Sequence, residues 1–267
     1  MKARIAAIVI AVSALCATAG ALAAAASLGT YVKIPGGSFK SVLKYEDSDR
    51  VGLKPFAIMD RPVTNAQFLE FVTGHPQWQR SRVPTVFAES RYLQGWQGDL
   101  QLGSKSLAQQ PVVEVSWFAA QAYCEAQGAR LPTWSEWEYV AAADATRRDA
   151  RRDPAWREAI LGWYSRPSNT PLQLVGKDQA NAYGVHNMHG LIWEWTEDYS
   201  SMLVSSDSRE QKADDRLKFC GAGAIAMNDK EDYAVLMRIA MLSALEGDDI
   251  TSNLGFRCAK PLAGTTP

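Results

Sequence analysis

The stretch of sequence that decides the fold is Asn181-Ala-Tyr-Gly-Val-His-Asn-Met-His-Gly-Leu-Ile-Trp-Glu-Trp195. Within fifteen residues it combines a glycine turn, a loop that could bind a metal ion, and two tryptophans on either side of a carboxylate. A second informative stretch, Asn253-Leu-Gly-Phe-Arg-Cys-Ala259, lies near the end of the sequence. The chain also has nine tryptophans, whose large amphipathic rings suit a loop-rich fold that stacks side chains.

Length and charge limit the classes of protein that the sequence can encode. The 267 residues are enough for one sizeable hydrophobic core or two small ones. The net charge of −1 and the pI of about 6.3 do not favour binding to nucleic acid or to an anionic membrane. Because no internal repeat or low-complexity linker appears, we predict a single domain over residues 24–267.

Residues 1–23 have the composition of a secretory signal peptide. Lys2 and Arg4 precede an uncharged run, and Ala21-Leu-Ala23 fits a cleavage site. An uncleaved membrane anchor is the alternative, since the uncharged run is just long enough to span a bilayer. The alanine-rich composition favours cleavage, so we expect a periplasmic or secreted protein without a membrane segment after cleavage.

Helix caps and apolar runs predict an α+β fold. Capping boxes at Thr64-Asn-Ala-Gln67 and Thr133-Trp-Ser-Glu136 predict two short helices, and a third helix is predicted between Ser116 and Gly128. We expect residues 77–110 to form a long ordered loop. The charge-rich residues 145–158 indicate a solvated helical face, with partner docking as the alternative. Strands are predicted at 31–39 (broken by a Pro-Gly-Gly turn), 111–116, 192–195, 217–220, 235–241 and 255–259.

In their order along the chain and in their amino-acid sequences, these segments resemble the formylglycine-generating enzyme, or sulfatase-modifying factor, family. The resemblance implies a variant of the C-type lectin fold with little regular secondary structure. It covers nearly the whole mature chain and is carried by Ile34-Pro-Gly-Gly-Ser-Phe39, Pro62-Val-Thr-Asn-Ala-Gln-Phe68, Pro111-Val-Val-Glu-Val-Ser-Trp117, Ala122-Tyr-Cys124, Arg130-Leu-Pro-Thr-Trp-Ser-Glu-Trp-Glu-Tyr139 and the two stretches quoted above.

The resemblance also implies a disulfide and a calcium site. Cys124 and Cys258 match a cysteine pair that forms a structural disulfide in the family. Calcium prefers six to eight oxygen ligands. At family positions that supply such oxygens, Asn187 and Glu194 would provide side chains, and Gly190 and Ile192 would provide backbone carbonyls. The alternative is a turn in which Asn187 caps backbone amides and Glu194 pairs with an arginine.

Formylglycine chemistry in the family uses two cysteines that hold copper before the final motif, and this chain lacks them. No cysteine lies between Gly221 and Arg257, and Asp229 and Ala234 stand at or near the expected positions. Because thiolates are the ligands that suit Cu(I), we predict that the chain does not generate formylglycine by that mechanism.

Other residues could carry residual chemistry. Cys220 is a candidate nucleophile or metal ligand, although a lone cysteine is more often a small buried hydrophobe. His186 and His189 could hold copper or iron. Arg238, like Arg257, could orient a ligand carboxylate or form a buried ion pair. Trp193 and Trp195 would share one face of a strand and belong to the core.

Three functional classes follow from these expectations. The first is a periplasmic accessory or maturation factor, because similar family members with the Cys220-Gly-Ala-Gly-Ala224 turn are associated with copper nitrite reductases. The second is a divergent oxidase of the siderophore-chromophore type, with Tyr164, Arg166, Cys220 and Arg238 as pocket residues. The third, a conventional formylglycine-generating enzyme, is disfavoured by the missing cysteine pair.

Overall fold

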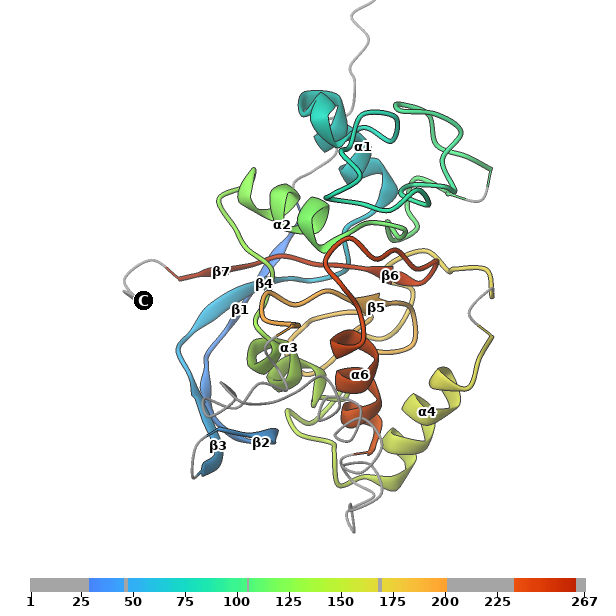
Figure 1. Cartoon of the computed structure of the whole chain (residues 1–267). Coiled ribbons are helices and arrows are strands. Elements are labelled where there is room, and N and C mark those ends of the chain that lie inside the picture. Colours follow the sequence, from blue (N-terminus) through green and yellow to red (C-terminus); the bar gives the residue numbers. More distant parts are fainter. Residues whose placement is uncertain (1–28, 46–47, 105, 168–169, 201–232, 263–267) are drawn as a thin grey trace, which may run out of the picture.

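Short strands and short helices connected by long loops make up the structure, a computed structural model (Figure 1). It describes residues 29–45, 48–104, 106–167, 170–200 and 233–262. The strands are β1 (Tyr31–Ile34), β2 (Gly37–Tyr45), β3 (Ser48–Leu53), β4 (Phe56–Met59), β5 (Trp193–Glu194), β6 (Leu254–Gly255) and β7 (Ala259–Pro261). The helices are α1 (Asn65–Gly74), the 3-10 helix η1 (Pro76–Trp78), α2 (Trp117–Glu125), α3 (Trp134–Ala141), α4 (Pro154–Tyr164) and α6 (Tyr233–Ser243).

An antiparallel sheet of order β1-β4-β7 brings the two ends of the described chain together. The hairpin β2-β3 and the parallel pair β5-β6 form two further small sheets. The predicted Pro-Gly-Gly turn separates β1 from β2. Gly36 has a φ of +72°, and a Cβ there would lie 2.5 Å from the carbonyl oxygen of Leu53, so this position requires glycine.

The predicted helix caps are confirmed. In α1 and α3 the side chain of the N-cap threonine, Thr64 or Thr133, accepts from the backbone three residues later, and both capping boxes are complete. Ser116 caps α2 in the same way. Each motif spans four residues and supplies hydrogen-bond partners for backbone N–H groups that the first turn of the helix leaves unpaired. The start of each helix is therefore determined by local sequence.

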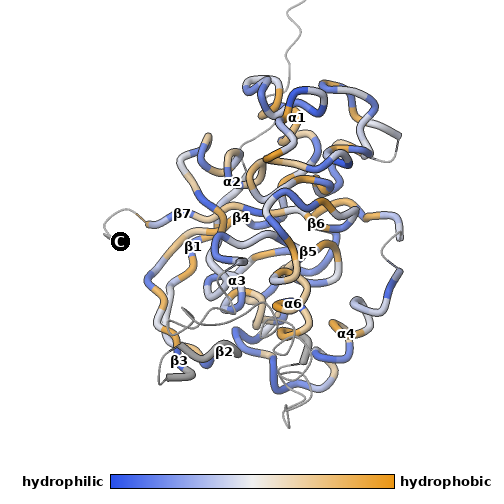
Figure 2. The backbone as a smooth tube through the Cα atoms, in the orientation of Figure 1, coloured by the Kyte–Doolittle hydropathy of each residue, from blue (hydrophilic) through white to orange (hydrophobic). Residues whose placement is uncertain are grey.

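The predicted strand over residues 235–241 is wrong, because these residues belong to α6. Val235, Ile239 and Leu242 are buried, at a spacing of four and three residues, whereas Met237 is 40% exposed. This spacing places the buried side chains on one face of a helix. Figure 2 shows the mostly apolar composition of α6, and a short apolar run of this kind is compatible with either a strand or a buried helix.

Two further expectations are corrected. Residues 111–116 form no named strand, since Pro111 makes only an isolated bridge to Thr64 and Glu114 has a φ of +59°. The charge-rich segment 145–158 is helical only from Pro154 onward. Before that residue, Asp144 accepts from the backbone amide of Arg147 and holds a turn. The predicted strand at 217–220 and the predicted signal peptide lie outside the described residues.

The expected loop over residues 77–110 is confirmed for its described part, which contains no helix beyond η1 and only an isolated bridge between Gly98 and Gln101. The core is rich in large rings, as the tryptophan content predicts. Trp134, Trp137 and Trp195 are fully buried, and the rings of the first two stack at 5.8 Å. None of the helices in the described ranges has the length and apolar composition needed to cross a membrane.

Candidate functional site

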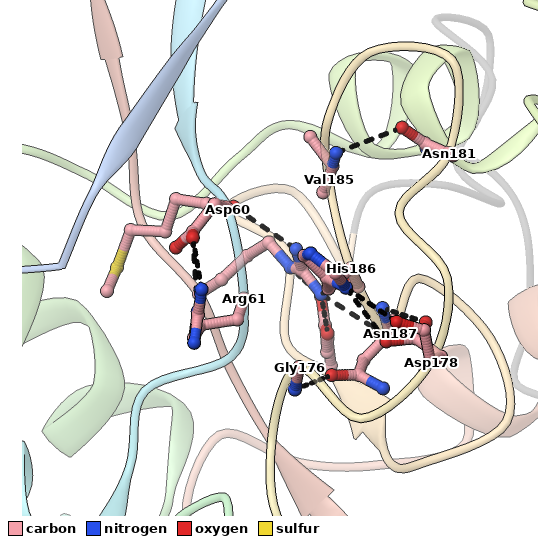
Figure 3. Close-up of polar contacts among 11 residues, drawn as sticks. Asp60, Arg61, Gly176, Asp178, Asn181, Val185, His186 and Asn187 are labelled. Atoms are coloured by element: carbon pink, nitrogen blue, oxygen red, sulfur yellow. Dashed lines mark hydrogen bonds and ion pairs between the residues drawn. The ribbon is translucent and has the colours of Figure 1, made fainter. Parts of the chain in front are cut away.

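Asn181 opens the decisive stretch and shapes its turn (Figure 3). Its side-chain oxygen accepts from the backbone amides of Tyr183 and Val185, while its amide nitrogen donates to the carbonyl of Val140. Gly184 follows with a φ of +82°. This single asparagine therefore folds the turn and attaches it to α3.

Asn187 holds the loop that we predicted to bind calcium. Its backbone amide donates to the carboxylate of Asp178 at 2.6 Å, and its side-chain oxygen accepts from the amide of Gly176 at 2.6 Å (Figure 3). The residue itself has a φ of +56°, in the left-handed region that asparagine tolerates. Asn187 thus caps a backbone amide, as the alternative interpretation of this loop proposed.

Glu194 forms a buried ion pair with Arg257. Its Oε1 accepts from Nη2 of Arg257 at 2.8 Å, and its Oε2 accepts from Nε at 2.8 Å and from the indole of Trp137 at 2.9 Å. Both charged side chains have no exposed surface. The pairing again matches the alternative interpretation, in which an arginine is the partner of Glu194.

Arg257 contacts several backbone carbonyls around this loop. Besides Glu194, its guanidinium donates to the backbone carbonyls of Met59, His186 and Asn187. Both oxygens of Glu194 are thus engaged in this arrangement, Oε1 by Arg257 and Oε2 by Arg257 and Trp137. Calcium binding through Asn187, Gly190, Ile192 and Glu194 stays a prediction, which metal analysis of the purified protein would test.

The two histidines of the stretch contact different groups. His186 lies with Nδ1 3.1 Å from the carboxylate of Asp178. His189 places Nε2 2.9 Å from the carbonyl of Ala141, with its ring edge-on to Trp137 and Trp156. Burial lowers the pKa of His189 to about 4, so its ring is neutral at neutral pH.

The described residues contain no group of three His, Cys, Asp or Glu side chains that could hold a metal ion. Downstream of the histidines, the carboxylate of Asp198 accepts from the backbone amide of Trp134. A redox-metal site made by His186 and His189 is therefore not supported by their surroundings. Cys220, Asp229 and the charged residues at 230–232 lie outside the described residues.

Tyr164 and Arg166 line a cavity of about 90 Å³ between the end of α4 and the loop before β5. Trp193 forms part of its wall, stacks on Tyr164 with ring centroids 4.7 Å apart, and contacts the ring of Trp163 at a tilt, with centroids 5.2 Å apart. Burial raises the pKa of the Tyr164 phenol to about 12, so the ring is neutral here. Two of the predicted pocket residues are thus brought together, whereas Trp163 was missed because its sequence neighbours show no motif.

Trp193 and Trp195 lie on either side of Glu194, and their backbone amides donate to the carbonyls of Asn253 and Gly255. That their side chains share one face stays a prediction. Strand β5 ends at Glu194, and Trp195 is fully buried with its indole donating to the carbonyl of Val115 at 3.0 Å. Trp193 is half-buried and faces the aromatic residues of α4. Trp195 therefore belongs to the core, and Trp193 to a cavity wall.

Arg238 reaches from α6 to the same region. It is 1% exposed, lies 3.5 Å above the centre of the Trp137 ring, and donates from Nη2 to the backbone carbonyl of Glu194 at 2.7 Å. Burial, reinforced by repulsion from Arg257, lowers the pKa of Arg238 to about 10. Among the described residues no carboxylate pairs with Arg238, in contrast to Arg257.

The expected disulfide between Cys124 and Cys258 is present, with a Cα–Cα distance of 5.6 Å. It joins α2 to the residue before β7 across 134 positions of sequence. Ala234, at an expected position of the family's cysteine pair, lies in the first turn of α6, four residues before Arg238.

Comparison with known proteins gives one family match and several similar sequences. The family model described as "Sulfatase-modifying factor enzyme 1-like domain" matches residues 18–262. The formylglycine-generating enzyme of Streptomyces coelicolor is 29% identical, over 85% of this chain and 88% of the relative. The inactive C-alpha-formylglycine-generating enzyme 2 of Bos taurus is 28% identical, over 88% of this chain and 89% of the relative.

More distant or partial matches include proteins with other names. Hercynine oxygenase of Mycolicibacterium smegmatis is 33% identical over 63% of this chain, a match that spans 45% of the relative. Among solved structures, PvdO from Pseudomonas aeruginosa is similar with a TM-score of 0.48 and 18% identity, over 87% of this chain and 94% of PvdO.

Proposed function

Because this chain belongs to the family of sulfatase-modifying factor enzyme 1-like domains, we propose that it is a member without formylglycine-generating activity. We propose further that it acts as an accessory or maturation factor for a periplasmic copper enzyme such as nitrite reductase. The family membership itself confirms the predicted resemblance and the α+β fold that the resemblance implied.

The number of free cysteines carries the proposal. The sequence has four cysteines, of which Cys124 and Cys258 form the disulfide. Cys16 lies in the predicted signal peptide, which leaves Cys220 as the one free thiol of the mature chain. A copper ion held by a cysteine pair needs two thiolates, and the mature chain has one to offer.

The similarity to a bovine protein named as inactive supports the same proposal. That similarity covers most of both chains, at 28% identity. In the present chain the fold is stabilised by the buried ion pair of Glu194 and Arg257 and by the disulfide. Neither contact uses a free cysteine. We therefore propose that the domain serves as a binding scaffold. Asp229 and Ala234 stand at or near the positions where the resemblance places the catalytic cysteines.

The proposed partner comes from the sequence resemblance. Members with similar Cys-Gly-Ala-Gly-Ala and Met-His-Gly-Leu-Ile-Trp-Glu-Trp segments are associated with copper nitrite reductases, and residues 1–23 favour export to the same compartment. We therefore propose that the reductase, or its copper delivery system, binds this protein.

The test is to produce a copper nitrite reductase in the periplasm with and without this chain, and to measure copper per reductase subunit together with nitrite reduction. We expect both to fall when the chain is absent. Cys220→Ser is the matched control and should restore both, since an accessory role does not use that thiol. Full copper loading without the chain, together with no complex in a pulldown between the two purified proteins, would contradict the proposal.

An oxidase is the second candidate, favoured by the cavity that Tyr164, Arg166 and Trp193 line. The partial similarity to a protein named hercynine oxygenase points to the same reaction class. Such an enzyme would consume oxygen with a small molecule or peptide of the siderophore-chromophore type, and Cys220→Ser or Arg238→Ala would abolish the consumption. If the purified protein consumes no oxygen with such precursors, this candidate is eliminated.

A further inference from the structure

Arg238 is a buried cation whose hydrogen-bonding capacity is only partly used. Its Nη2 donates to the carbonyl of Glu194, but Nε and Nη1 have no partner among the described residues, although the side chain is 1% exposed. Buried donors are almost always paired, and a buried charge normally has an opposite charge beside it. Among the described residues, Nε and Nη1 of Arg238 therefore lack an acceptor, and no carboxylate pairs with its charge.

The neighbouring charges make the imbalance larger. Glu194 is the carboxylate that acts on Arg238, and Arg257 binds both of its oxygens. The group formed by Arg238, Arg257 and Glu194 thus holds two cations and one anion, all fully buried. A cluster with this net positive charge attracts a further anion.

A small cavity adjoins Arg238. It has a volume of about 10 Å³, and its charged lining residues are Arg238, Arg151 and Glu138. Arg151 and Glu138 form an ion pair with each other at 3.5 Å, so they leave the charge balance of the cluster unchanged. The rest of the lining is aromatic or apolar: Trp137, Trp156, Tyr164, His189, Ala141, Ala142 and Val235. A space of this size holds about one water-sized occupant. Aromatic rings and apolar side chains form much of the wall, which lowers the local dielectric. Electrostatic attraction between Arg238 and an ion is stronger in such surroundings than in bulk water.

We propose that Arg238 and this cavity form a binding site for a small monovalent anion of the halide class. Nε or Nη1 of Arg238 donates to the anion, and the anion neutralises the charge that Glu194 leaves uncompensated. The inference rests on the contacts of Arg238 alone and is independent of the proposed accessory role.

A single water molecule is the competing occupant. Water accepts from Arg238 and can donate to Nδ1 of His189, which also has no partner among the described residues. Water, however, leaves the net positive charge of the cluster in place, whereas a halide removes it. The charge balance therefore favours the anion, and the two occupants predict different responses to salt.

The first test measures the thermal unfolding midpoint of the mature protein at fixed pH, sodium concentration and ionic strength, while gluconate is replaced by chloride or bromide. Gluconate is too large for the cavity. We expect a saturable rise of the midpoint with either halide, since a ligand that binds only the folded state stabilises it. Equal midpoints in gluconate and in halide would overturn the proposal in favour of water.

Two variants assign the effect to the site. Arg238→Met removes the charge but keeps a long apolar side chain, and we expect it to abolish the halide-dependent rise. Arg166→Met is the matched control, because Arg166 is exposed and lines the neighbouring cavity, and it should keep the rise. A halide response that persists in Arg238→Met would contradict the assignment.

If Arg238→Met fails to fold, crystals of the unmodified protein in bromide decide the question. The site predicts an anomalous scattering peak within hydrogen-bond distance of Nε or Nη1 of Arg238. Bromide found elsewhere, with a non-anomalous water peak in the cavity, would overturn the proposal.

Discussion

Glu194 and Arg257 show how a single pair of residues connects the decisive stretch to the end of the chain. The pair is fully buried and bidentate, and Trp137 adds a third hydrogen bond to the carboxylate. Arg257 also donates to three carbonyls of distant segments. The pair therefore fixes the position of the loop around Asn187 relative to the sheet.

Replacing Glu194 by glutamine tests this role. Glu194→Gln leaves the charge of Arg257 buried and unpaired, so we expect the free energy of unfolding to fall by about 3–5 kcal/mol. Urea denaturation followed by circular dichroism gives the value. Arg91→Gln, which breaks an exposed pair with Glu89, is the control and should cost at most about 1 kcal/mol. Equal small losses for the two variants would show that the buried pair is not needed for stability.

Among the secondary-structure elements, α6 departs most from expectation and also bears on the site. Its buried residues recur with helical spacing, and it packs against α4, whose last residue, Tyr164, lines both cavities (Figure 1). Because Arg238 lies on α6, the position of this helix determines where the unpaired charge is held. A strand over the same residues would have placed Met237 and Ile239 on one face.

Two alanine substitutions distinguish a helix from a strand. Leu242→Ala removes a fully buried side chain of α6, and we expect a loss of about 2–5 kcal/mol in the free energy of unfolding. Met237→Ala changes a residue that is 40% exposed and should cost less than about 1 kcal/mol. Chemical denaturation of both variants provides the comparison, and a large loss for Met237→Ala with little for Leu242→Ala would contradict the helix.

Locally determined elements were predictable, and those that depend on distant contacts were not. The capping boxes at Thr64 and Thr133 satisfy backbone groups within four residues, so the sequence alone locates them. The segment around Val235 has an apolar run whose burial depends on what packs against it, and it was assigned to the wrong element. The unpaired state of Arg238 could not be predicted either, because it depends on the engagement of Glu194 with Arg257.

In the whole molecule, the disulfide between Cys124 and Cys258 closes the largest covalent loop of the described structure. It links α2 to the C-terminal part of the sheet across 134 residues, so it restricts the unfolded chain strongly. The resemblance to a known family predicted the pairing, whereas the four cysteines of the sequence do not by themselves say which two are bonded. Long-range cross-links of this kind stabilise mainly by lowering the entropy of the unfolded state.

Removal of the disulfide should therefore be costly. The double change Cys124→Ser and Cys258→Ser is expected to lower the free energy of unfolding by about 4–5 kcal/mol on the chain-entropy account. Denaturation with and without reductant measures it: reductant should destabilise the unmodified protein and leave the double variant unchanged. Cys220→Ser is the control and should retain the sensitivity to reductant. Unchanged stability of the double variant would contradict a structural role for the bridge.

The most direct test of the central claim is to co-produce the chain with a sulfatase substrate in copper-replete cells. Mass spectrometry then measures conversion of the substrate cysteine to formylglycine. The account predicts an unmodified cysteine, because Cys124 and Cys258 form the disulfide and no cysteine lies between Gly221 and Arg257, where the resemblance places a copper-binding pair. An active formylglycine-generating enzyme under the same conditions should convert the substrate and serves as the positive control. Conversion by this chain would contradict the account and would show that formylglycine can be made without the cysteine pair.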